Sequence, residues 1–201
     1  MERRFEAVLF DMDGVLVQSF DAWLALVNAV AARFGHAPVP RERFLEVHGQ
    51  SNEADIEMFF PTVSLPDLER YYADHFADHT HLVKVDAGAR PVLDALRRRG
   101  VPTAVVTNTL RPVARAILDG ASLAPDVLAT ASDVRRPKPA PDMVRLACER
   151  LSVPPPRAIM VGDSRYDRAA AEAAGVAFAG YGGMRGRYML TRLEDLLPLL
   201  P

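Results

Sequence analysis

Two aspartates stand one residue apart at the end of an apolar run near the start of the chain. Residues 5–16 read FEAVLFDMDGVL, so Asp11 and Asp13 directly follow aromatic and branched aliphatic residues. A tight turn needs at most one Asp or Asn besides a glycine, and Gly14 already supplies the glycine. The second carboxylate therefore indicates chemistry. One carboxylate can attack phosphorus, and an acid two residues away, on the same side of the chain, can give the leaving oxygen its proton.

Residues suited to phosphoryl chemistry also follow later apolar runs. They comprise one hydroxyl, one amide, two further carboxylates and one ammonium, from Thr107, Asn108, Asp163, Asp167 and Lys138. Carboxylates that crowd together repel one another unless a cation sits among them, and hard oxygen ligands that leave positions to water and phosphate are typical of Mg²⁺. The hydroxyl and the ammonium can stabilise the oxygens of a transferring phosphoryl group.

The elements that must position these residues are apolar runs that alternate with helical patterns. The runs are Phe5–Phe10, Val101–Thr107, Arg157–Val161 and Val176–Ala179, with a weaker one at Asp126–Ala129. Strands that are covered on both faces have such largely apolar sequences, and their alternation with helices of about 10–15 residues predicts a parallel sheet. Ligands bind such sheets at the carboxyl ends of the strands, where the polar residues lie. We therefore predict an α/β fold with a three-layer, Rossmann-like parallel sheet core.

One long segment interrupts this alternation. Residues 17–84 contain no convincing strand, and their apolar spacing predicts amphipathic helices at Phe20–Phe34, Arg41–Val47, Asn52–Phe60 and Pro66–His79. We expect residues 1–16 and 85–201 to form the catalytic core and residues 17–84 to form an inserted, all-helical cap domain. Trp23 is expected in the apolar core of that cap.

Composition excludes several classes of protein. The chain has 201 residues, of which 49% are hydrophobic and 25% charged, as in an ordinary globular protein, and its net charge of −2 gives no sign of a nucleic-acid or acidic-lipid surface. A single cysteine, Cys148, rules out an intrachain disulfide. The apolar stretch before Asp11 has only four residues, too short for a signal-peptide core, and the longest stretch without a charge, residues 173–184, falls short of the about 20 residues that a membrane span needs. We expect a cytoplasmic protein that binds neither nucleic acid nor membranes.

The motifs together resemble a known family. DMDGVL, VVTNT, the lysine of RRPKPAPD and GDSRYD resemble, in this order, the four motifs of the haloacid dehalogenase-like hydrolase superfamily. The resemblance implies that Asp11 is the nucleophile and also contacts Mg²⁺, that Asp13 is the general acid/base and ligates the metal through its main-chain carbonyl, and that Asp163 binds the metal. By the same resemblance, Thr107 and Asn108 hold the phosphoryl group, Lys138 neutralises charge and positions Asp11, and Asp167 supports the metal's water shell or Lys138.

The resemblance is greatest to the branch of phosphoglycolate phosphatases and beta-phosphoglucomutases with a helical cap. It implies a Mg²⁺-dependent phosphatase that hydrolyses a small phosphorylated metabolite through an aspartyl-phosphate. Asp13 favours hydrolysis of a C–O–P ester, because dehalogenases of the superfamily lack an aspartate at this position.

Two alternatives stay open. One is a sugar-phosphate mutase, although Gly49-Gln50-Ser51-Asn52 lacks the arginine of the mutase cap loop and Trp23 stands where mutases have a histidine. The other is a non-catalytic phospho-acceptor similar to receiver domains, which lack both the second acid and a cap.

Overall fold

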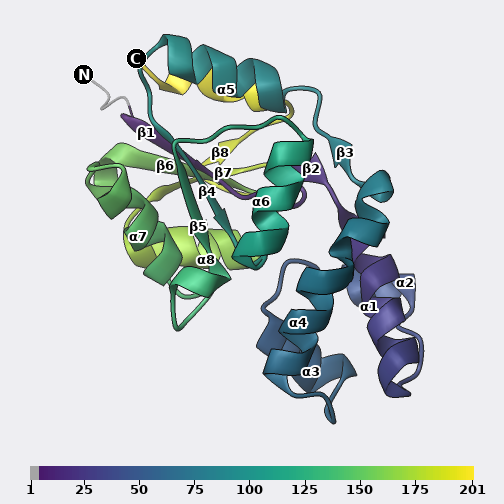
Figure 1. Ribbon diagram of the computed structural model, residues 1–201. Coiled ribbons are helices and arrows are strands. Elements are labelled where there is room, and N and C mark those ends of the chain that lie inside the picture. The colour runs from purple at the N-terminus through teal and green to yellow at the C-terminus, as the bar shows by residue number, and fades with distance from the viewer. Residues whose placement is uncertain (1–4) are drawn as a thin grey trace.

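The structure is a computed structural model that describes residues 5–201 (Figure 1). Its centre is a parallel sheet of six strands in the order β5-β4-β1-β6-β7-β8. In chain order the strands are β1 (Ala7–Phe10), β4 (Thr103–Thr107), β5 (Val127–Thr130), β6 (Ala158–Gly162), β7 (Ala177–Gly180) and β8 (Tyr188–Met189). The predicted α/β fold with a parallel sheet is confirmed.

Helices cover both faces of this sheet. Val8 and Phe10 of β1 face a core formed with α5 (Ala89–Arg98), α6 (Arg111–Gly120) and the 3-10 helix η4 (Leu193–Leu199). Ala7 and Leu9 face a second core formed with α7 (Asp142–Arg150) and α8 (Arg165–Ala174). Successive side chains of a strand point to opposite faces, so one short strand contributes to both cores and the architecture has three layers (Figure 1). Two short 3-10 helices, η2 (Ala131–Asp133) and η3 (Pro155–Arg157), lie in connecting loops.

The chain leaves the sheet after β1 and forms a separate group of helices (Figure 1). We call residues 19–83 the helical module. It contains α1 (Phe20–Phe34), α2 (Arg41–Leu45), α3 (Asn52–Phe59), α4 (Leu65–His75) and the 3-10 helix η1 (Phe76–Leu82). Two short antiparallel strands, β2 (Val17–Gln18) and β3 (Lys84–Val85), connect the module to the rest of the chain.

The module has an apolar interior that is continuous with the core on one face of the sheet. Leu26, Leu68 and Tyr72 are buried within the module and belong to the same cluster as Phe10 of the sheet.

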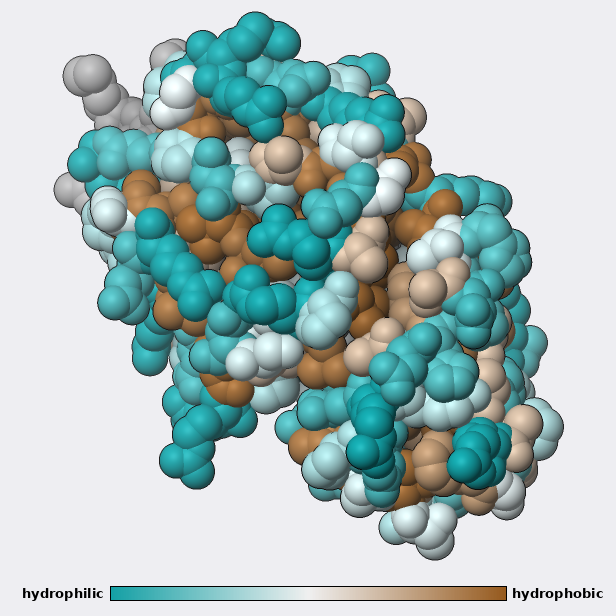
Figure 2. All heavy atoms as spheres, viewed as in Figure 1, coloured by the Kyte–Doolittle hydropathy of each residue, from teal (hydrophilic) through white to brown (hydrophobic). Residues whose placement is uncertain are grey.

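In Figure 2, hydrophilic residues project over much of the visible face, with hydrophobic residues between them. Within residues 5–201, no helix is both long and apolar enough to cross a bilayer.

Candidate active site

Three neighbouring strands end at the same edge of the sheet. In the register of β1, Phe10 pairs with Val105 of β4 on one side and with Val161 of β6 on the other. The strand order reverses at β1, because β4 and β5 lie on one side of it and β6 and β7 on the other. In parallel sheets such a reversal leaves a crevice at the carboxyl ends, where ligands bind.

A pocket at this edge contains the sequence-predicted residues. Asp11, Asp13, Thr107, Asn108 and Lys138 all line it. Asp163 and Asp167 lie beside Asp11, and these three side chains offer carboxylate oxygens within 4.8 Å of one another. The fold therefore brings all of the predicted site residues into one place, although the role of each stays a prediction.

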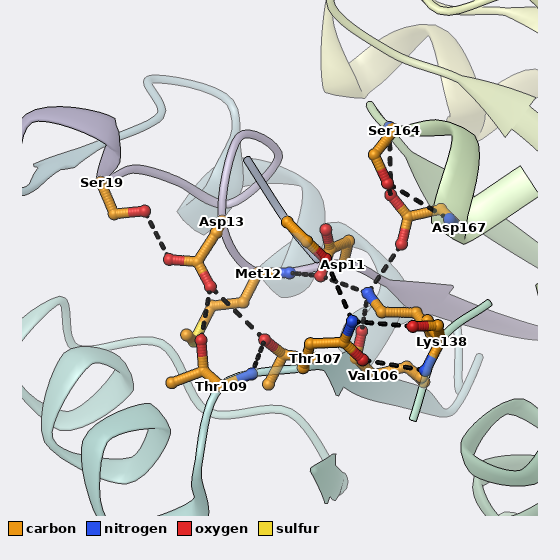
Figure 3. Close-up of polar contacts among 12 residues, drawn as sticks. Asp11, Met12, Asp13, Ser19, Val106, Thr107, Thr109, Lys138, Ser164 and Asp167 are labelled. Carbon is orange, nitrogen blue, oxygen red and sulfur yellow. Dashed lines mark hydrogen bonds and ion pairs between the residues drawn. The ribbon is translucent and has the colours of Figure 1, made fainter. Parts of the chain in front are cut away.

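Lys138 connects the carboxylates (Figure 3). Its ammonium is buried and donates hydrogen bonds to Asp11 Oδ1 at 2.8 Å, to Asp167 Oδ1 at 2.7 Å and to the carbonyl of Val106 at 2.8 Å. Burial alone would lower the pKa of Lys138, but the charges of Asp11 and Asp167 outweigh this effect and raise its pKa above the ordinary value. The side chain therefore stays charged inside the protein.

Asn108 holds the segment that carries this lysine. Its Oδ1 accepts a hydrogen bond from the Lys138 main-chain N–H at 2.9 Å, and its Nδ2 donates to the Lys138 carbonyl at 3.0 Å. The same Nδ2 donates to the carbonyl of Gly49 in the helical module at 3.0 Å. One side chain after β4 thus ties together Lys138, the end of the strand and the module.

The buried acidic cluster carries more negative than positive charge. Burial raises the pKa of Asp11 well above its ordinary value, and the neighbouring charges of Asp167 and Asp163 add to this effect against the opposing charge of Lys138. Burial, followed by the charge of Asp167, raises the pKa of Asp163 to about 7. Three carboxylates face one ammonium, so part of the negative charge of the cluster is not balanced. The all-oxygen donor set of the cluster suits Mg²⁺. The residues present therefore fit a magnesium ion.

Glycine at position 14 allows the loop after β1 to close on the cluster. Gly14 has a φ of 85°, in the left-handed region, and a Cβ atom there would lie 1.9 Å from Asp163 Oδ2. A Cβ atom at Gly162 would likewise lie 2.4 Å from Asp167 Cβ. Only glycine permits this approach of the backbone to both carboxylates.

Asp13 has a different set of partners from Asp11. Its Oδ1 accepts hydrogen bonds from the hydroxyl of Ser19 and from Trp23 Nε1, the latter at 3.0 Å. Its Oδ2 accepts from the hydroxyls of Thr109 at 2.9 Å and Thr107 at 3.4 Å. Figure 3 shows the carboxylate directed at Ser19 and Thr109. Donors on both oxygens fix the orientation of this carboxylate.

The helical module supplies the other side of the pocket. Trp23 of α1, His48 and Gln50 of the loop after α2, and Asn52 and Asp55 of α3 line it. The pocket measures about 490 Å³ when the open solvent at its mouth is counted. Trp23 also packs against Tyr72 and Phe76, with ring centroids 5.5 and 4.9 Å away, so it lies at the edge of the module core, half-buried, as well as in the pocket lining.

Asp55 is a buried carboxylate in this part of the lining. It accepts hydrogen bonds from Gln50 Nε2 at 2.7 Å and from the Tyr72 hydroxyl at 3.0 Å. Burial raises the pKa of Asp55 to about 6, although the two donors oppose the rise. Burial also lowers the pKa of His48, so its ring is neutral near pH 7. None of these module residues belongs to a sequence motif, and none was predicted as a site residue.

Residues 8–181 match the family described as haloacid dehalogenase-like hydrolase. The chain belongs to this family. The resemblance read from the four motifs is thus confirmed, and the match includes the helical module as well as the strands that carry the site.

Relatives of this haloacid dehalogenase-like chain are phosphohydrolases with different substrates in their names. A phosphoglycolate phosphatase of Cupriavidus necator is 32% identical, over 97% of this chain and 91% of its own length. Hexitol phosphatase A of Escherichia coli is 34% identical, over 80% of this chain and 76% of its own length. The predicted enzyme class, a phosphohydrolase of the haloacid dehalogenase-like family, is confirmed.

Solved structures of the family share the fold over almost the whole chain. CbbY from Rhodobacter sphaeroides, in complex with phosphate, is 26% identical with a TM-score of 0.84 and covers 98% of this chain and 99% of its own. A beta-phosphoglucomutase from Clostridium difficile has a TM-score of 0.81 at 16% identity and shows the same fold, with 97% of this chain and 96% of its own covered. The fold is thus shared with CbbY and with a beta-phosphoglucomutase.

Proposed function

We propose that this protein is a Mg²⁺-dependent phosphatase that hydrolyses the phosphate monoester of a small metabolite through a phosphorylated Asp11. The observation that carries the proposal is the contrast between two carboxylates one residue apart. Asp11 pairs with the ammonium of Lys138 within the acidic cluster, whereas hydroxyl and indole donors hold Asp13 outside it. Two carboxyl groups in unlike environments can divide the roles of nucleophile and general acid/base.

The first step transfers the phosphoryl group to the enzyme. A carboxylate oxygen of Asp11 attacks phosphorus while the bond between phosphorus and the leaving oxygen breaks, and protonated Asp13 gives its proton to that oxygen. In the second step Asp13 takes a proton from water, whose oxygen attacks phosphorus. The aspartyl-phosphate bond breaks, and free Asp11 and inorganic phosphate result.

The remaining residues hold charge and position. Lys138 keeps Asp11 in place and balances its charge, with Asp167 as its second partner. The Thr107 hydroxyl lines the pocket and would donate to a phosphoryl oxygen. The Asn108 side chain already donates to the carbonyls of Lys138 and Gly49, so its main-chain N–H would make the contact with phosphate. Mg²⁺, held by Asp11, Asp163 and the main-chain carbonyl of Asp13, would neutralise charge on the phosphoryl oxygens. The helical module acts as the cap over this site.

The test is turnover of p-nitrophenyl phosphate with Mg²⁺, after removal of the metal with EDTA, and in Asp11→Asn. We expect EDTA to abolish turnover and added Mg²⁺ to restore it. Asp11→Asn should lose at least about 1,000-fold in kcat, because a neutral amide does not attack phosphorus. Asp119→Asn, which changes an exposed aspartate on α6 in the same way, should keep the wild-type rate.

Two outcomes would contradict the proposal. If Asp11→Asn kept a tenth of the wild-type rate, the nucleophile would be another residue. If no metal supported turnover in the wild-type protein, a non-catalytic phospho-acceptor would be the better interpretation.

A further inference from the structure

The part of the pocket that would hold the leaving group combines polar residues with the apolar Phe44 and Val47, and it carries no positive charge. Its polar residues come from the helical module and are His48, Gln50, Asn52 and Asp55, together with the indole of Trp23. Within residues 5–201, the only lysine or arginine that lines the pocket is Lys138. That ammonium is already bound to Asp11 and Asp167, so it offers nothing to a second anionic group of the substrate.

Two arginines of the module stand close in sequence to the residues that line the pocket, but both form ion pairs with other side chains. Arg41 forms an ion pair with Asp21 at 2.5 Å, and Arg43 pairs with Glu46 at 2.7 Å. Both arginine side chains are more than half exposed and neither lines the pocket. A carboxylate or a second phosphate on the substrate would therefore find no counter-charge on this side of the site.

Asp55 makes the same region favourable for hydroxyl groups. Its two oxygens each accept one hydrogen bond, from Gln50 and from Tyr72, and each retains acceptor capacity. A hydroxyl can donate to a buried carboxylate, and such charge-assisted hydrogen bonds are stronger than neutral ones. An anion in the same position would instead meet a like charge in a poorly solvated pocket. Only 8% of Asp55 is exposed, so solvent screens this repulsion little.

We propose that the pocket selects phosphate monoesters of neutral polyhydroxy alcohols over those with a carboxylate or second phosphate, and that Asp55 receives a substrate hydroxyl. This inference rests on the proposed phosphatase function and specifies its substrate class. It makes Asp55 a specificity-determining residue, one that acts on the leaving group and not on the phosphoryl group.

The experiment compares kcat/KM of the Mg²⁺-loaded enzyme for a hexitol 6-phosphate, for phosphoglycolate and for p-nitrophenyl phosphate. We expect the wild-type enzyme to prefer the hexitol phosphate to phosphoglycolate by at least about tenfold, the range that one charge-assisted hydrogen bond provides. Equal use of the two substrates, or preference for phosphoglycolate, would overturn the inference. Loss of turnover with p-nitrophenyl phosphate would instead mean that the proposed function itself is wrong.

Asp55→Asn tests the residue. The variant should lose about tenfold more kcat/KM with the hexitol phosphate than with p-nitrophenyl phosphate, and its efficiency with phosphoglycolate should rise relative to both. Glu53→Gln, which neutralises an exposed acid on the same helix, should leave all three values unchanged. An equal loss on every substrate would contradict the role of Asp55. The wild-type ratio needs no variant, so the inference remains falsifiable even if Asp55→Asn does not fold.

Discussion

The two aspartates after β1 differ in what surrounds them, and this difference has a kinetic consequence. The carboxylate of Asp13 is held by Thr109, Ser19 and Trp23 and not by the ammonium that holds Asp11. As the proposed general acid, Asp13 should contribute most to the rate when the leaving oxygen needs a proton in the transition state.

Asp13→Asn should therefore slow the hydrolysis of an alkyl phosphate about 1,000-fold and that of p-nitrophenyl phosphate only about tenfold, since nitrophenolate leaves with little protonation. The measurement is kcat on both substrates with Mg²⁺ at saturation. Equal losses on the two substrates would remove Asp13 from the acid role.

Asp55, the proposed specificity-determining residue, should also make the stability of the protein depend on pH. Because burial raises its pKa in the folded protein to about 6, the folded state binds a proton at Asp55 more tightly than the unfolded chain does. Stability is therefore lost as the pH rises from about 4 to about 6, and the full cost, about 3 kcal/mol, is present above that range.

Asp55→Asn removes this cost and should raise the free energy of unfolding at pH 8 by up to about 3 kcal/mol. The altered hydrogen bonds with Gln50 and Tyr72 reduce this gain. At pH 5 the gain should fall to about half. Urea denaturation at the two pH values measures it, with Glu53→Gln as the control. A gain that did not depend on pH would show that the charge of Asp55 is not its cause.

The motif residues of the site could be predicted from the sequence, whereas most of the residues that contact them could not. Asp11, Lys138 and Asp163 each follow a recognisable apolar run or stand in a recognisable motif, so strand topology alone brings them together. Ser19 and Asp55 are isolated polar residues whose contacts with the site depend on how the module packs against the sheet. Thr109 ends the VVTNT motif, but its hydrogen bond to Asp13 depends on how the loops after β1 and β4 approach each other. No local pattern contains that information.

Among the elements, the strongly apolar strands were predictable and the marginal ones were not. β1 and β4 lie within the predicted runs, and β6 and β7 each extend one residue beyond theirs, to Gly162 and Gly180. β2 and β8 have two residues each, too few to give a periodic pattern, and the partner of β2 is distant in the chain. The helix predicted at Pro66–His79 ends as an α-helix at His75 and continues as a 3-10 helix to Leu82, and a spacing near three residues per turn is hard to distinguish from that of an α-helix.

The loop after β1 must approach β6 closely to join the acidic cluster, and Gly14→Ala tests this requirement. A Cβ atom at Gly14 would meet the carboxylate of Asp163, so we expect the variant to need at least about tenfold more Mg²⁺ for half-maximal activity. The left-handed backbone adds a cost of about 1 kcal/mol to stability.

Gly35→Ala is the matched control for this variant. Gly35 has a φ of 74° at the end of α1, and nothing lies within 4 Å of an added Cβ atom. It should lose similar stability but keep its Mg²⁺ requirement. If the two variants had the same Mg²⁺ requirement, the contact with Asp163 would not control the metal site.

In the whole molecule, the helical module and the sheet meet over the pocket. Trp23 of α1 donates to Asp13, and the carbonyl of Gly49 accepts from Asn108, so the module contacts the residues that follow two different strands. Its only connections along the chain are β2 and β3, which lie side by side. A body joined by two adjacent short strands can move as a unit, and closure would exclude water from the phosphoryl group.

Such a cap should restrict the enzyme to small substrates. In the proposed mechanism, closure would expel water and so strengthen the contacts of Lys138 and Mg²⁺ with phosphate, and a folded phosphoprotein would not fit beneath the closed module. We expect kcat/KM for a small metabolite phosphate to exceed that for a phosphopeptide and, by a larger factor, that for a folded phosphoprotein.

The reverse order would mean that the module does not act as a lid. The same idea can be tested by replacing residues 19–83 with a short Gly-Ser link, because Gln18 and Lys84 pair directly and the link need only close a hairpin. The shortened protein, once circular dichroism shows that it is folded, should lose small-substrate efficiency and small-substrate selectivity together, since the module supplies both water exclusion and the lining around Asp55.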